Sequence, residues 1–240
     1  MYGYRARIGY TSPPAATEVF PYEFYKIVPD GVTLVISTLP LVDRTSDEVD
    51  RAYEVSLDVA HAMARAEVDI MVFGGLPINA SRGFANADEM AAATEREIGI
   101  PVVTSLSSQR DALKALGSKK VGIVQPYDDS HGPRHEKYIR EYGLEPVGWT
   151  CLNTTFIELG KMDAEQTLEA GRRLCREHPD TDTVYIFCPH YCAIGVIDTL
   201  EQEFGVTVMT SLQAIVWNAL RRCGVDDRID GYGRLFTSEE

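Results

Sequence analysis

The segment Gly99-Ile-Pro-Val-Val-Thr-Ser-Leu106 recurs in the second half of the chain as Gly205-Val-Thr-Val-Met-Thr-Ser-Leu212. In each copy a glycine precedes a short run rich in β-branched residues, and a helical pattern follows it. Two further pairs of strand-like segments match in the same order, namely 8–13 with 121–126 and 70–75 with 184–189. Any two buried strands resemble each other, but three matches in one order indicate a duplicated α/β unit.

Apolar stretches alternate with amphipathic stretches along both copies, which is the pattern of βα units around a parallel sheet. In the first half it predicts strands at 7–11, 32–38, 70–73 and 102–104 and helices at 18–26, 46–66, 88–98 and 107–116. In the second half it predicts strands at 121–124, 146–151, 184–187 and 206–209 and helices at 131–142, 163–177, 194–204 and 212–222. We therefore predict an α/β fold of two pseudo-symmetric Rossmann-like domains, each a parallel four-stranded sheet flanked by helices. The first domain is expected over residues 1–116 plus 213–240, and the second over 117–212.

Composition and charge narrow the class of protein. The chain has 240 residues, of which 45% are hydrophobic, so it can bury a core. Its formal net charge is -13 and it has no basic patch, which excludes nucleic acid and anionic membrane surfaces as partners. No apolar run reaches the roughly 18 residues of a membrane span.

The cysteines are odd in number and scattered, unlike a disulfide framework. They are Cys151, Cys175, Cys188, Cys192 and Cys223. We expect free thiols. The N-terminus lacks the basic start and apolar stretch of a signal peptide, so a cytoplasmic protein is expected. Self-association is left open.

The functional site is predicted from the direction of the strands. In open α/β sheets a ligand binds beyond the carboxyl ends of the strands. The segments to inspect are 11–15, 74–83, 126–130 and 188–192. Two similar halves would bring these segments together, so we predict an active site in the cleft between the domains.

Cys188 closes a predicted strand and precedes a predicted helix. A helix N-terminus lowers the pKa of a nearby thiol, and such a thiol can give or take a proton. The alternative is a core cysteine that packs as a small hydrophobe. His190 either orients or deprotonates a cysteine, or is a solvent-facing loop histidine.

Other residues at the strand ends could bind a substrate. The Tyr127 phenol could donate a hydrogen bond to a carboxylate or an enolate, or pack at the rim. The glycine-rich turn from Gly74 to Gly83 allows close backbone approach but lacks the spacing of a P-loop or a dinucleotide fingerprint. The Ser12-Pro-Pro-Ala-Ala16 turn is a rigid pocket wall. There is no Gly-x-Ser-x-Gly elbow and no His-Glu-x-x-His run.

Metal binding is disfavoured. Cys188 and Cys192 stand four residues apart with His190 between them, but structural zinc needs a second ligand pair. His131 and His135 offer only the i, i+4 spacing of a helix. We predict neither a metal nor a cofactor.

Together these residues resemble a known family. The duplicated halves, Cys188 and the terminal Gly231-Tyr-Gly-Arg-Leu-Phe236 resemble the aspartate/glutamate racemase superfamily, in its branch of maleate cis-trans isomerases and arylmalonate decarboxylases. In that branch each half can offer a cysteine, and the decarboxylases keep only the second. This chain resembles the one-cysteine pattern, with Gly75 at the first position. Its Pro13-Pro-Ala-Ala16 turn is similar to that of the decarboxylases, and Tyr127 falls on a tyrosine shared by both groups.

The resemblance implies a decarboxylation without a cofactor. A disubstituted malonate would lose one carboxylate in an apolar pocket, hydrogen-bond donors would hold the enediolate, and the cysteine would protonate one face. This chain differs from the decarboxylases in the residues that would donate hydrogen bonds to the enediolate. It has Leu76 and Pro77 where they have hydroxyl residues, and Pro189 where they have glycine. Proline donates no backbone hydrogen bond, so Asn79, Ser81 or His190 is expected to substitute.

We expect a decarboxylase of a small malonate-type carboxylic acid, with Cys188 as the proton donor and Tyr127 as the donor to the carboxylate or enolate. The expected substrate-binding residues are Pro14, Gly74, Gly75, Leu76, Asn79, Ser81, Pro189, His190 and Cys192. One alternative is a maleate-type isomerase or an amino- or hydroxy-acid racemase in which Cys188 works with Cys192 or His190. Another is a non-catalytic protein that binds a small molecule.

Overall fold

The computed structural model describes residues 2–12, 18–43 and 45–237, apart from the side chains of residues 84 and 85. Strands and helices alternate along it. The strands are β1 (Ala6–Ser12), β2 (Val32–Thr38), β3 (Ile70–Phe73), β4 (Val102–Thr104), β5 (Lys120–Gln125), β6 (Glu145–Cys151), β7 (Thr183–Ile186) and β8 (Thr207–Thr210). The helices are α1 (Val19–Ile27), α2 (Ser46–Arg65), α3 (Leu76–Ala80), α4 (Phe84–Ile98), α5 (Ser105–Ala115), α6 (Gly132–Glu141), α7 (Ala164–Glu177), α8 (Ile197–Phe204) and α9 (Ser211–Arg222). Short 3-10 turns cover Asp129–His131, Phe156–Lys161, Ile194–Val196 and Arg234–Phe236.

Each half of the chain forms one four-stranded sheet. The first has the strand order β2-β1-β3-β4 and the second has the corresponding order β6-β5-β7-β8. Neighbouring strands run parallel in both sheets. The predicted fold class, two parallel four-stranded sheets flanked by helices, is therefore confirmed.

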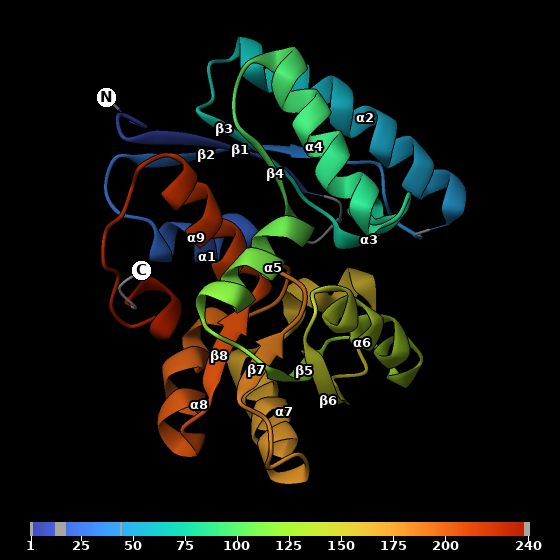
Figure 1. The fold of residues 1–240 in the computed structure, drawn as a ribbon, viewed down its shortest axis with the longest axis vertical. Coiled ribbons are helices and arrows are strands. Elements are labelled where there is room, and N and C mark those ends of the chain that lie inside the picture. Colours follow the sequence, from blue (N-terminus) through green and yellow to red (C-terminus); the bar gives the residue numbers. More distant parts are fainter. Residues whose placement is uncertain (1, 13–17, 44, 238–240) are drawn as a thin grey trace.

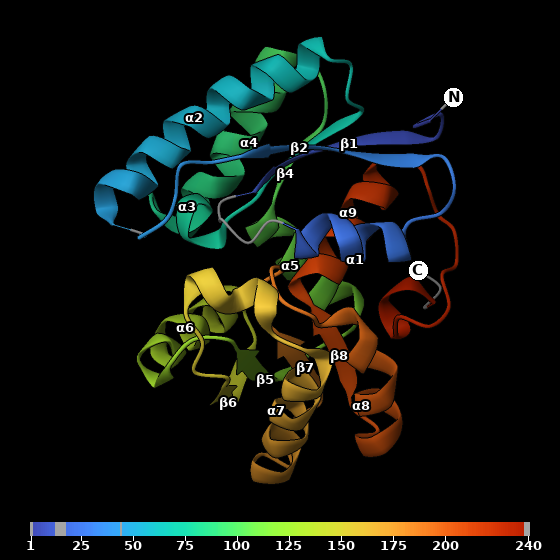
Figure 2. The ribbon, with the colours of Figure 1, turned by 180° about the vertical axis from the view of Figure 1, so that it is seen from behind.

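Helices cover both faces of the first sheet (Figures 1 and 2). α2 and α4 lie on its outer face, whereas α1, α5 and α9 lie on the face turned towards the second half. α5 and α9 pack against each other, and α9 also contacts both β3 and β8. One hydrophobic core runs from Ile8 and Val72 in the first sheet through Ile215 of α9 to Ile123 and Ile186 in the second. The predicted domain boundaries at 116/117 and 212/213 stay a prediction.

The recurring glycine-to-leucine segment has the same role in both halves. Gly99 and Gly205 end helices α4 and α8 in the left-handed conformation, with φ of 75° and 70°, which glycine adopts without a steric penalty. The last residue of each short strand is a threonine, Thr104 or Thr210, which accepts a hydrogen bond from the backbone N–H of the third helical residue. These caps start α5 and α9 at Ser105 and Ser211, earlier than predicted.

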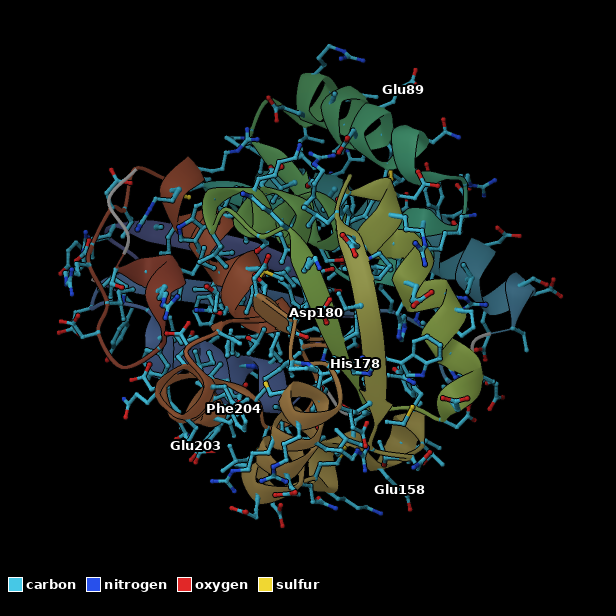
Figure 3. All side chains as sticks on the ribbon, turned by 60° about the horizontal axis from the view of Figure 1, so that its bottom comes forward. Glu89, Glu158, His178, Asp180, Glu203 and Phe204 are labelled. Atoms are coloured by element: carbon cyan, nitrogen blue, oxygen red, sulfur yellow. The ribbon has the colours of Figure 1, made fainter. Side chains whose placement is uncertain are left out.

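The second sheet points its carboxyl ends towards the first half. Figure 3 brings its amino-terminal end forward, where His178 and Asp180 lie in the turn before β7. Asp180 forms an ion pair with Lys120 at the start of β5, with an N–O distance of 3.1 Å. The strand ends that could bind a ligand therefore lie on the opposite side, inside the molecule.

The glycine-rich segment after β3 is a helix where an irregular turn was expected. Helix α3 begins after Gly75, and Pro77 lies in its first turn, where a missing N–H breaks no helical hydrogen bond. The following helix, α4, begins at Phe84 and not at residue 88. Gly74 is required by packing, because a Cβ atom there would lie 1.9 Å from the carbonyl oxygen of Thr11. None of the helices in the described ranges combines the length and apolar character that a membrane crossing requires.

Candidate active site

A pocket lies between the two halves, at the carboxyl ends of the central strands. The first half contributes Gly75, Leu76 and Ser105, and the second contributes Cys188 and Ser211. Its cavity volume is about 50 Å³. The remaining lining residues come from the loops and helices around the opening: Leu41, Pro77, Gln109, Tyr127, His131, Arg134, His135, Tyr138, Phe156, Phe187, Pro189 and His190.

Cys188 has a backbone conformation that is rare for a residue with a side chain. Its φ is 82°, and Gly75, the second residue after β3 as Cys188 is after β7, has a φ of 80°. This conformation costs a non-glycine residue on the order of 1–3 kcal/mol, and such residues cluster at active sites. The Cys188 backbone N–H donates to Ser211 Oγ over 3.0 Å, which helps to hold the turn.

Tyr127 and Cys188 meet in the pocket. The Tyr127 hydroxyl lies 4.0 Å from Cys188 Sγ, and both side chains are buried. The Tyr127 ring also packs beside the His131 ring, with 4.9 Å between their centroids. A small molecule next to the thiol would therefore lie within reach of the phenol.

Two helices other than the expected one begin at the pocket. The helical segment that follows Cys188 in sequence begins only at Ile194, whereas Ser211, the first residue of α9, bonds directly to the Cys188 backbone. Ser105, the first residue of α5, also lines the pocket. The N-termini of helices attract anions through their free N–H groups and dipoles, so α5 and α9 favour a carboxylate here.

His190 is buried beside Cys188. Its side chain is 2% exposed, which contradicts the alternative of a solvent-facing loop histidine. Within the described part of the chain neither ring nitrogen has a hydrogen-bond partner. Burial lowers the pKa of His190 to about 3, so the imidazole is neutral at physiological pH.

The other predicted residues divide into two groups. Gly75, Leu76 and Pro189 line the pocket with Cys188, Tyr127 and His190. Pro14 lies outside the described residues. The predicted residues that lie away from the pocket lining are Gly74, Asn79, Ser81 and Cys192.

Each residue of this second group has another contact. The Gly74 N–H donates to Thr11 Oγ1. Asn79 is buried, and its Oδ1 accepts a hydrogen bond from Ser105 Oγ over 2.8 Å. Ser81 is exposed at an outer cavity, and the Cys192 carbonyl accepts from Thr167. Of the three substitute donors that the sequence suggests, His190 is thus the one at the pocket.

Sequence reasoning missed several lining residues. Ser105 and Ser211 belong to the recurring Thr-Ser-Leu motif, which was used as evidence for the fold, although its position after a strand could have indicated the site. Gln109 and Arg134 lie within helical patterns and carried no such signal. Arg134 and His131 line both the pocket and the adjoining outer cavity of about 480 Å³. A search of the described residues finds no cluster of three or more potential metal ligands.

Comparisons with known proteins show which family the chain is similar to. A family profile described as arylmalonate decarboxylase matches residues 8–236. The chain is 28% identical to an arylmalonate decarboxylase from Bordetella bronchiseptica over 231 residues, 95% of each chain. It is 26% identical to a maleate isomerase from Nocardia farcinica over 139 residues, 58% of this chain and 55% of that protein. A structure of unliganded arylmalonate decarboxylase superposes with a TM-score of 0.84 at 27% identity, covering 96% of this chain and 98% of that one.

Proposed function

Because the chain belongs to the arylmalonate decarboxylase family, we propose that it is a cofactor-independent decarboxylase of a small, malonate-type carboxylic acid. The observation that supports this best is the pairing of Cys188 with Gly75. The two residues occupy matching turns of the two halves at one pocket. The second half therefore contributes a thiol at this position, whereas the first half has a glycine without a side chain.

The reaction uses groups that line the pocket. The substrate carboxylates lie near the N-termini of α5 and α9, and one of them is pressed against apolar wall residues such as Leu76 and Phe187. Loss of carbon dioxide breaks the bond to the α-carbon and leaves its electron pair as an enediolate, whose charge the hydrogen-bond donors stabilise. Cys188 gives its S–H proton to the α-carbon, and the resulting thiolate regains a proton from water.

The opening of the pocket suits an anionic substrate. The chain is strongly acidic overall, so the substrate needs local positive charge. Arg134 and His131 lie where the inner pocket meets the outer cavity. The Arg134 guanidinium supplies such a charge at this junction.

The experiment is proton NMR in deuterated water with a panel of malonates, maleate, and amino and hydroxy acids. We expect a malonate to lose carbon dioxide and take deuterium at its α-carbon, and Cys188→Ser to abolish this. Cys223→Ser is the matched control, because Cys223 is outside the pocket lining. Turnover that survives Cys188→Ser contradicts the mechanism.

A second candidate is an isomerase or racemase, which the similarity to a maleate isomerase favours. It predicts cis-trans conversion or α-deuterium exchange without loss of carbon. Cys192→Ser tests the predicted thiol partner and is expected to have little effect, because Cys192 is outside the pocket lining. Silence across the panel indicates a non-catalytic binding protein.

The proposal includes a small carboxylate as the ligand and the cytoplasm as the location. All five cysteines are unbonded, which is typical of a reducing compartment. Self-association is checked by measuring the mass of the protein in solution by light scattering.

A further inference from the structure

The ring nitrogens of His190 have no hydrogen-bond partner in the described structure, although they are buried, where an unsatisfied polar group destabilises the folded state. It lies two residues after Cys188 and lines the same pocket. Both ring nitrogens are buried without a hydrogen-bond partner among the residues that the structure describes. A tilted contact with the Phe20 ring, 6.3 Å between centroids, adds an apolar neighbour on the side of α1. Buried polar groups are almost always hydrogen-bonded, and an exception calls for an explanation.

The imidazole is equipped to donate a hydrogen bond. Burial lowers the pKa of His190 to about 3, so the ring is neutral at physiological pH. A neutral imidazole has one N–H donor and one acceptor nitrogen. A neutral donor can bind an oxyanion without adding a fixed charge to the pocket.

Two neighbouring serine hydroxyls are already engaged. Ser105 Oγ donates to Asn79, and Ser211 Oγ is shared between the Cys188 N–H and the Tyr185 hydroxyl. Pro77 and Pro189, which also line the pocket, have no N–H to offer. Gln109 presents a buried carbonyl oxygen without a partner in the described structure, and this atom can only accept.

We propose that His190 is a catalytic residue whose ring N–H binds the substrate carboxylate that becomes the enediolate. This inference rests on the proposed function, since it assigns a role in that reaction. The hydrogen bond strengthens as negative charge gathers on the carboxylate oxygens, so it lowers the barrier more than it improves substrate binding.

The kinetic test compares His190→Phe with His190→Gln on a malonate that the wild type decarboxylates. Removing one such donor typically lowers kcat by about 10²–10³-fold. We expect that loss for His190→Phe with a much smaller change in KM, and partial recovery for His190→Gln, whose amide can donate. Unchanged kcat in His190→Phe overturns the proposal.

The matched control is His61→Phe. His61 is on α2, is partly exposed, and pairs with Glu97 over 3.3 Å, away from the pocket. We expect it to leave kcat unchanged. Thermal unfolding checks that the variants fold. His190→Phe is expected to melt no lower than the wild type, because it removes two unpartnered polar atoms from a buried site.

A binding experiment separates this proposal from the proposed function. Histidine ring nitrogens of the ¹⁵N-labelled full chain are observed by NMR while malonate, phenylmalonate or succinate is added, and His190→Phe identifies the His190 signals. We expect a neutral ring at pH 6–8 whose N–H nitrogen shifts when a carboxylate binds. A shift without turnover supports the His190 contact while the decarboxylase proposal fails. No shift with any of the three acids overturns the His190 proposal, even if the decarboxylase is active.

Discussion

At the scale of single residues, Cys188 has a strained backbone conformation that places its thiol at the pocket. With a φ of 82°, the residue holds a conformation that a Cβ atom disfavours. Glycine adopts it freely, and Gly75 does so at the matching turn of the first half. The thiol is therefore retained at some cost in stability, which is the pattern of a residue kept for chemistry.

This strain can be measured with two variants that both lack the thiol. Cys188→Gly should be more stable than Cys188→Ala by roughly 1 kcal/mol, because only alanine pays for the positive φ. Urea unfolding gives the two free energies. A matched pair at an ordinary buried cysteine, Cys175→Gly and Cys175→Ala in α7, should show the opposite order, since glycine weakens a helix. If Cys188→Ala equals or exceeds Cys188→Gly in stability, the turn is not strained.

The buried His190 also predicts a dependence of stability on pH. Its pKa falls from 6.5 to about 3 on folding, so between these values the unfolded chain binds more protons than the folded one. Stability is therefore lost as the pH falls below about 6.5, by on the order of 1 kcal/mol per pH unit from this group. The loss between pH 7 and pH 5 should shrink in His190→Phe and persist in His61→Phe, as followed by urea unfolding. Equal losses in all three proteins contradict the desolvated state of His190.

The residues of the site were only partly predictable from sequence. Cys188, Tyr127, Gly75 and His190 follow strands, and the rule that ligands bind at the carboxyl ends of strands finds them. Ser105, Ser211, Gln109 and Arg134 belong to helices, and their place at the pocket depends on how α5, α6 and α9 pack. The isolation of the His190 nitrogens is a three-dimensional property that no spacing reveals.

At the scale of elements, strand, cap and helix form one repeated unit. Thr210 ends β8, caps α9 and precedes Ser211, which bonds to the Cys188 backbone. The same residues thus end a strand, start a helix and hold the turn at Cys188. The cap that stabilises α9 therefore also fixes the position of Ser211 next to the Cys188 backbone.

The cap gives a prediction at this scale. Thr210→Ala removes a side-chain oxygen that accepts from the Gln213 N–H, and should cost about 1 kcal/mol of unfolding free energy. Thr210→Ser keeps that oxygen and should recover most of it. Denaturant unfolding of both proteins makes the comparison. Identical stabilities for the alanine and serine variants would show that the cap contributes nothing.

The element boundaries show where sequence patterns lose information. The central strands are buried β-branched runs, so their periodicity found them within a residue or two. Helix α3 was not predicted, because its sequence, Leu-Pro-Ile-Asn-Ala, follows two glycines and contains a proline, and both residue types favour turns. The caps on Thr104 and Thr210 lengthen α5 and α9 beyond their amphipathic patterns.

At the scale of the whole molecule, one buried carboxylate links the two halves near the site. Glu23 on α1 accepts hydrogen bonds from the backbone N–H groups of Ala193 and Ile194, in the loop that follows Cys188. The other oxygen, Oε2, is buried without a partner in the described ranges of the chain. Desolvation raises the Glu23 pKa, against the opposing effect of these two hydrogen bonds.

A carboxyl group whose pKa is raised by folding stabilises the folded state at low pH. This stabilisation is lost as the pH rises through the pKa of the folded state. Here the folded state holds its proton more tightly than the unfolded one, so ionisation of Glu23 at neutral pH lowers stability. Glu23→Gln keeps an oxygen for the two N–H groups and cannot ionise. Its stability relative to the wild type should rise between pH 4 and pH 7.5 in guanidinium unfolding. A constant difference over that range contradicts the account of Glu23.

We propose that a single acid, Cys188, acts from one side of a pocket that two similar halves enclose. The most direct test is chiral analysis of the product formed from a prochiral disubstituted malonate. Protonation from Cys188 alone, opposite the bare Gly75, predicts one enantiomer. A racemic product would contradict the account, because it would require protonation of both faces of the enediolate.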